Sequence, residues 1–168
     1  MNIFTGNLYL EEDMFRFEKV SKEQWAKDAP YSYDNIKLPK RGTAGSAGYD
    51  FFSVINFVLE PGQTILLPTG IRMIVDSDKF LLMLPRSGQG FKTKVQLYNT
   101  AGVIDSDYSH SKSGGHIFIK LYNDSPEGKS LFVETGDAIC QGICLPYFVT
   151  DNDDCIEDRD GGFGSTDK

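Results

Sequence analysis

Short runs of β-branched and aromatic residues, cut by Gly, Pro, Asn and Asp, fill the chain from about Ile36 onward. Such runs predict strands, which we expect at 51–59, 64–75, 80–84, 94–98, 115–122, 131–134 and 138–149. Turn residues such as Pro61-Gly62 and Asn123–Gly128 separate the runs. Strands at this spacing, with almost no helix between them, favour an all-β fold of the antiparallel sandwich or jelly-roll kind.

The segment before these strands contains one helix start signal. Ser21 is a suitable N-cap, and Gln24 stands three residues later, where it can complete a reciprocal capping pair. Val20 and Trp25 occupy the two positions of a hydrophobic staple, and Pro30 lies just beyond the expected helix. We therefore expect a short helix in residues 1–35, a segment that extends the β domain and packs on it.

Length and composition narrow the class of protein. A chain of 168 residues suits one β domain, here expected over 36–150, followed by a Gly-rich arm over 151–168. The arm has too few apolar groups to order alone, so we expect it to be mobile and to order over a ligand. The net charge of -7 argues against a large nucleic-acid surface but not against a small nucleotide.

Targeting and redox signals point to the cytoplasm. The sequence shows neither a signal peptide nor an apolar run long enough for a membrane span. Three sparse cysteines, Cys140, Cys144 and Cys155, argue against a disulfide scaffold. Metal-ligand spacing is also absent, and we interpret His110 and His116 as solvated histidines and the cysteines at 140 and 144 as packed thiols.

Four polar segments carry candidate chemistry. Pro85–Gly88 joins one guanidinium, one hydroxyl and a flexible backbone, a composition that suits an anion and equally a surface turn. Gly102–Tyr108 places two carboxylates beside apolar residues, as a general base needs, although an Asp-rich turn has the same pattern. Gln141 enters a strand after a turn, and alone it is also explained as a polar residue on an outer face. Arg159–Thr166 combines glycines, hydroxyls, one Arg and one Phe, a set that suits phosphates and a base.

Taken together, these segments resemble the trimeric dUTPase family over roughly 38–166. The five family motifs occur in order, at 47–51, 85–88, 99–108, 136–141 and 159–166. The resemblance implies a distorted jelly roll with a short N-terminal helix and a flexible C-terminal arm. It also implies a homotrimer in which more than one chain builds each site. The activity implied is hydrolysis of dUTP to dUMP and pyrophosphate with Mg²⁺ held through phosphates and waters, in the cytoplasm of a bacterium or from a phage gene.

The resemblance also implies a role for each matched residue. Asp105 would be the general base, and Tyr108 would lie under the deoxyribose and exclude a 2′-hydroxyl. The other roles fall into groups. The uracil contacts would come from Asn99 and the backbone around Gly102 and Ile104; the phosphate contacts from Arg86, Ser87, Gly88 and Gln141; the arm contacts from Arg159, Phe163, Gly164, Ser165 and Thr166; and support from Asp50.

Two departures and two alternatives accompany the resemblance. Residues 109–114 look like a polar insertion after Tyr108, and Arg159 stands one residue closer to Phe163 than is common in the family. A phage-type regulatory relative that binds a protein partner is one alternative. The other is dCTP deaminase, whose catalytic Glu would fall near Lys120, where a Lys cannot serve as a carboxylate.

Overall fold

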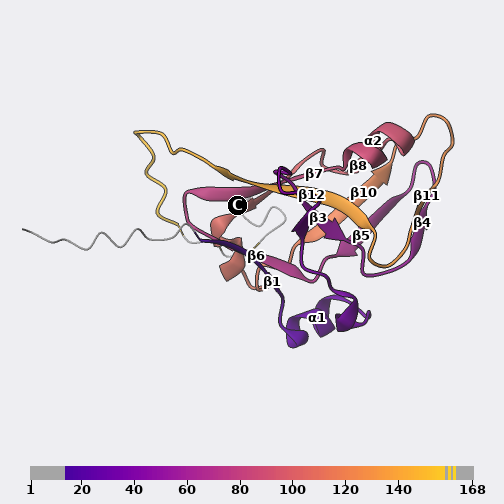
Figure 1. The fold of residues 1–168 in the computed structure, drawn as a ribbon. Helices are drawn as coiled ribbons and strands as arrows, with labels where there is room; N and C mark the ends of the chain where they lie inside the picture. Colours follow the sequence, from indigo (N-terminus) through magenta and orange to yellow (C-terminus); the bar gives the residue numbers. More distant parts are fainter. Residues whose placement is uncertain (1–13, 158, 160, 162–168) are drawn as a thin grey trace, which may run out of the picture.

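The computed structural model describes residues 14–157, 159 and 161. Strands dominate this part of the chain and confirm the predicted all-β class (Figure 1). The strands are β1 Phe15–Lys19, β2 Lys40–Arg41, β3 Tyr49–Phe52, β4 Phe57–Leu59, β5 Thr64–Pro68, β6 Ile71–Val75, β7 Lys79–Leu84, β8 Val95–Leu97, β9 Gly102–Asp105, β10 Phe118–Asn123, β11 Leu131–Val133 and β12 Ala138–Pro146. The helical elements are α1 Lys22–Asp28, α2 Ser87–Thr93 and two 3₁₀ turns, η1 Tyr33–Asn35 and η2 Ser106–His110.

The strands described here pair antiparallel in four groups. The largest sheet has the order β2-β3-β12-β7-β9, a second has the order β5-β10-β8, and β1-β6 and β11-β4 form two-stranded ribbons. Alternation along the strands supplies the core, as in β6, where every second residue is buried. Phe51 of β3, Leu81 of β7 and Leu121 of β10 are almost completely shielded from solvent. Side chains from both larger sheets therefore contribute to one hydrophobic core.

Two predicted strands are each broken in the structure. The run 51–59 divides into β3 and β4 at a turn in which the Ser53 hydroxyl bonds the backbone C=O and N–H of Ile55, at 2.6 and 3.3 Å. The run 64–75 divides into β5 and β6 at Gly70, which has a φ of +71°. The prediction of continuous strands was wrong at both places. Strands β1, β2 and β9 and helix α2 were not predicted.

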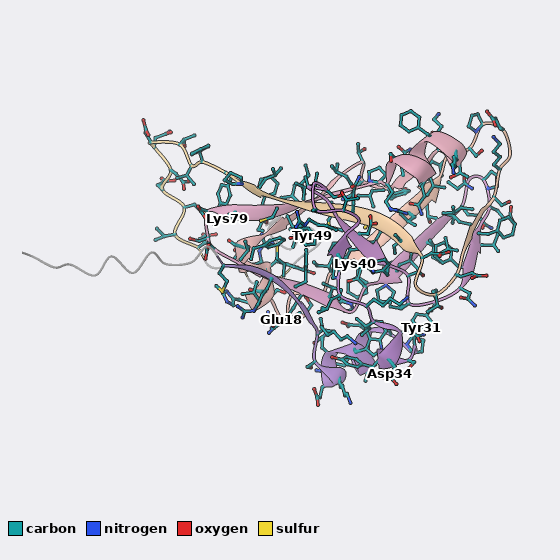
Figure 2. All side chains as sticks on the ribbon, viewed as in Figure 1. Glu18, Tyr31, Asp34, Lys40, Tyr49 and Lys79 are labelled. Carbon is teal, nitrogen blue, oxygen red and sulfur yellow. The ribbon has the colours of Figure 1, made fainter. Side chains whose placement is uncertain are left out.

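The N-terminal segment packs onto the β structure. β1 pairs with β6 over five residues. Figure 2 shows Tyr49 in the middle of the molecule. The rings of Phe15 and Phe17 pack edge-on against the Tyr49 ring, with 5.5 and 5.4 Å between ring centroids. The predicted helix is present as α1, with the Ser21 hydroxyl accepting from the backbone N–H of Gln24 at 3.1 Å. The predicted reciprocal bond from the backbone N–H of Ser21 to the Gln24 side chain is not formed, and the NH2 group of Gln24 donates to Asp28 at 2.8 Å.

In the part of the chain that the structure describes, no helix is long and apolar enough to cross a membrane.

Candidate active site

A cavity of about 310 Å³ lies where β9 ends and η2 begins, and we call it the Asp105 pocket. Asn99, Gly102, Ile104, Asp105 and Tyr108, all predicted site residues, line it. β9 is the edge strand of the five-stranded sheet, so within the described residues only one of its sides is paired, to β7. The backbone groups of the other side are therefore available to a ligand.

A second cavity, which we call the Arg86 pocket, measures about 590 Å³. The residues that were predicted to bind the phosphates line this cavity. Asp50, Arg86, Ser87, Gly88 and Gln141 all line it. Asp50 holds the guanidinium of Arg86 with both carboxylate oxygens, at 3.0 and 3.3 Å. Such a bidentate pair fixes the plane of the guanidinium and leaves its remaining N–H groups for other acceptors.

Strand β12 and helix α2 give the Arg86 pocket its shape. In the ladder Gln141 stands opposite Asp50 on one side and Leu84 on the other, and its amide donates to Pro85 O at 3.1 Å. Gly48 permits this arrangement, because a Cβ there would lie 2.5 Å from Gln141 Oε1. Ser87 and Gly88 form the first turn of α2, ahead of the first intrahelical bonds to Arg86 O. Backbone N–H groups in such a turn are suited to an anion.

Arg159 lies in the Asp105 pocket rather than beside Arg86. Its guanidinium pairs with the carboxylates of Asp105 and Asp107, the latter at 2.6 Å, and lies 6.0 Å from the centre of the Tyr108 ring. Burial by itself lowers the pKa of Arg159, but hydrogen bonds and charges from Asp107 and Asp105 outweigh it and raise the pKa above its ordinary value. Arg159 therefore stays a cation that pairs with both carboxylates and offsets one of their two negative charges.

The predicted site residues thus fall into two groups in one chain. The Asp105 pocket and the Arg86 pocket have no lining residue in common. Phe163, Gly164, Ser165 and Thr166, the remaining predicted arm residues, lie outside the described residues. Lys120, which stands where the deaminase alternative needs a Glu, lines the Asp105 pocket with its ammonium 4.0 Å from the Tyr98 ring centre.

The interpretation of His116 as a solvated histidine was wrong. Its side chain is completely buried, where its ring accepts from Gly70 N–H and pairs with Asp28 at 2.6 Å. Tyr108 reaches the same residue, because its hydroxyl donates to His116 O at 2.9 Å. The sequence offered no signal for this cluster, since Asp28 and His116 are 88 residues apart.

The described residues offer no cluster of three or more His, Cys, Asp or Glu side chains that could hold a metal ion. The described side chains therefore do not form an all-protein cage for a divalent ion.

Fold and pockets together define an antiparallel β protein of the jelly-roll kind, with a carboxylate pocket and an arginine pocket that have no lining residue in common. A family model described as dUTPase matches residues 34–167. The chain therefore belongs to the dUTPase family, as the five motifs predicted.

Curated relatives agree with this assignment. The deoxyuridine 5′-triphosphate nucleotidohydrolase of Lactococcus lactis is 37% identical over 153 residues, covering 89% of this chain and 95% of that protein. The enzyme of the same name from Actinobacillus pleuropneumoniae is 40% identical over 143 residues, covering 80% of this chain and 90% of its own. The Lactococcus match is longer than residues 34–168 alone can supply, so part of the N-terminal segment has a counterpart there.

Solved structures confirm the predicted fold. The crystal structure of the dUTPase from Streptococcus mutans superposes with a TM-score of 0.66 at 30% identity, covering 82% of this chain and 99% of that one. The dUTPase from phage phi11 of S. aureus superposes with a TM-score of 0.63 at 21% identity, covering 86% of this chain and 97% of its own. The second likeness shows the fold alone.

Proposed function

We propose that this protein hydrolyses dUTP to dUMP and pyrophosphate. Membership of the dUTPase family and the activity named for relatives at 37–40% identity support this reaction. The single observation that carries it is the Asp105 pocket, in which a half-exposed carboxylate, an amide side chain and a buried aromatic ring line one cavity.

Asp105 is our candidate for the general base. Attack at the α-phosphorus needs a water in line with the leaving group and a group that accepts its proton. The free edge of β9 offers alternating backbone donors and acceptors to the amide-like edge of uracil, and Asn99 adds a side-chain amide. A base with the wrong pattern would leave buried polar groups unpaired, which disfavours cytosine.

Arg159 occupies one oxygen of the Asp105 carboxylate in this structure, and its departure would leave both oxygens to the attacking water. A triphosphate offers the guanidinium more negative charge than the two carboxylates that it pairs with in this structure. We therefore propose that arrival of the substrate draws Arg159 from Asp105 to the phosphates. The contacts of Phe163, Ser165 and Thr166 with the nucleotide stay predictions of the family resemblance.

The Arg86 pocket is our candidate for the phosphate site. Arg86 is held by Asp50, and the first turn of α2 and the Gln141 amide supply neutral donors beside it. Mg²⁺ carried by the triphosphate would neutralise developing charge there. The chain's own residues would bind and orient the phosphates.

We propose a homotrimer with composite sites, because the two pockets have no lining residue in common within one chain. A nucleotide whose base lies in one Asp105 pocket would reach the Arg86 pocket of a neighbouring copy. Sedimentation tests the assembly, and a fully active monomer would contradict it.

Mixed assemblies test the composite site directly. Chains carrying Asp105→Asn and chains carrying Arg86→Ala should each be inactive alone. Coexpressed in equal amounts, they should recover about a quarter of wild-type activity, since a site needs one intact residue from each of two copies. No recovery in verified mixed trimers would place both residues of a working site on one chain.

Pyrophosphate release from dUTP, dCTP, dTTP and UTP with Mg²⁺ tests the reaction. We expect hydrolysis of dUTP alone, and its loss by at least about a hundredfold in Asp105→Asn. Asp107→Asn is the matched control, because it removes the neighbouring partner of Arg159 and leaves the proposed base. Equal losses in both variants would mean that Asp105 acts only as a partner of Arg159.

The partner-binding alternative is tested with the same variant. Hydrolysis lost by Asp105→Asn while a protein partner is still bound would mean that both functions coexist. Deamination of dCTP is disfavoured by Lys120, which supplies a cation where that reaction needs a carboxylate. A cytoplasmic location stays a prediction, supported by cysteines that are all free.

A further inference from the structure

The ring of Tyr108 is fixed at its far end. Tyr108 belongs to η2, is 8% exposed and lines the Asp105 pocket. Its hydroxyl donates to the backbone oxygen of His116 at 2.9 Å. The ring therefore forms a wall of the pocket whose position depends on where His116 lies.

His116 is in turn held by two hydrogen bonds that define its protonation. Gly70 N–H donates to Nε2 at 2.9 Å, so Nε2 carries no proton. The proton of the neutral ring is then on Nδ1, which donates to the Asp28 carboxylate at 2.6 Å. Trp25 and Phe118 pack against the ring at 5.8 and 4.3 Å between centroids. His116 thus has one tautomer and one orientation.

These contacts connect helix α1 to the pocket wall through three residues. Asp28 is the last residue of α1, and its carboxylate oxygen also accepts from Gln24 of the same helix at 2.8 Å. Removing the carboxylate would leave the buried Nδ1–H of His116 without a partner. A buried donor without a partner is costly, so the ring would move to find one and displace the backbone oxygen that Tyr108 holds.

We propose that Asp28 and His116 are positioning residues that hold the Tyr108 ring as the wall against a 2′-hydroxyl. This inference rests on the proposed function, in which Tyr108 lies under the deoxyribose. Selection of deoxyribonucleotides is then set partly from the N-terminal helix. The ring has to exclude a single oxygen atom, the 2′-hydroxyl of a ribonucleotide. A displacement of the ring by about 1 Å is enough to make room for that atom, because specificity depends on side-chain positions to within about this distance.

The test compares dUTP with UTP. The measured quantity is the ratio of kcat/KM for the two nucleotides in the wild type, Asp28→Ala, Asp28→Asn and Glu23→Ala. We expect Asp28→Ala to lower the ratio about tenfold, mainly through KM, because the bond that it removes is buried. Asp28→Asn should stay within about threefold of wild type, since its amide oxygen still accepts from Nδ1–H. Glu23→Ala, an exposed position on the same helix, should leave the ratio unchanged.

A second variant keeps the test decisive if Asp28→Ala does not fold. Tyr108→Phe keeps the ring and removes the hydroxyl that donates to His116 O and accepts a longer bond from Ser113 at 3.5 Å, and it should also lower the ratio. In the double variant the two losses should not add, because both break one connected path. An unchanged ratio in folded Asp28→Ala or in Tyr108→Phe would overturn the inference. A wild type that leaves dUTP intact would instead refute the proposed function itself.

Discussion

Gly114 and Gly115 form a matched pair for testing how the loop after η2 supports the pocket. Both have positive φ, +62° and +76°. A Cβ at Gly114 would meet nothing within 4 Å, whereas one at Gly115 would lie 2.7 Å from Ser109 Cα and 3.2 Å from Tyr108 O. Replacing each by Ala therefore separates backbone strain, which both share, from a backbone clash, which only Gly115 has.

The expected losses follow from that difference. Ala in the left-handed region lowers the free energy of unfolding by about 1 kcal/mol, and at Gly114 this is the whole expected loss. At Gly115 the added methyl meets backbone atoms that cannot turn aside as a flexible side chain can, and forced displacement adds about 1–3 kcal/mol. We expect Tm to fall by about 3 °C for Gly114→Ala and by about 9 °C for Gly115→Ala, with about 2–4 °C per kcal/mol at this chain length.

Thermal unfolding at one fixed protein concentration measures both values, since assembly makes Tm depend on concentration. The kcat/KM for dUTP should also fall in Gly115→Ala, because the clash displaces the backbone of Tyr108 itself. Gly114→Ala should retain it. Equal losses of stability in the two variants, with activity kept in both, would refute the reasoning.

Three further predictions concern other parts of the molecule. Burial lowers the pKa of His116 below its ordinary value of 6.5 despite Asp28, so the free energy of unfolding should fall as pH drops below 6.5. Urea titrations at a series of pH values should show that this free energy depends less on pH in His116→Asn. Burial raises the pKa of the Cys140 thiol, so an aromatic disulfide reagent should label exposed Cys155 at once and Cys140 only after unfolding. Phe17→Ala should cost about 2 kcal/mol in thermal unfolding, because its ring packs edge-on against Phe51 at 5.4 Å; a loss under about 0.5 kcal/mol would mean that β1 contributes little to the core.

The sequence predicted those elements whose signals are local. The cap at Ser21 and the staple of Val20 and Trp25 located α1, and runs of β-branched and aromatic residues between turn residues located most strands. β1 is no such run, because its two Phe residues alternate with charged ones. β9 is different, because only Val103 and Ile104 favour a strand, and Gly102 and Asp105 on either side of them do not.

Contacts between distant residues were beyond a sequence pattern. The five motifs brought the candidate site residues together by resemblance, but their division between two pockets depends on how β7, β9 and β12 pair. The bond between Asp28 and His116 joins a helix to a loop 88 residues later. The Gly/Ser-rich stretch before His116 has the composition of a surface loop. Only the packing of the folded chain shows that His116 is buried.

The position of β12 has a consequence for how the chain is made. This last strand lies between β3 and β7, so the five-stranded sheet has a gap at its middle until residues 138–146 leave the ribosome. Most of the chain must therefore wait, with unpaired strand edges, for roughly its last fifth to arrive. Folding should be almost entirely post-translational, and chains stalled before Ala138 should be captured by chaperones instead of reaching a stable partial fold.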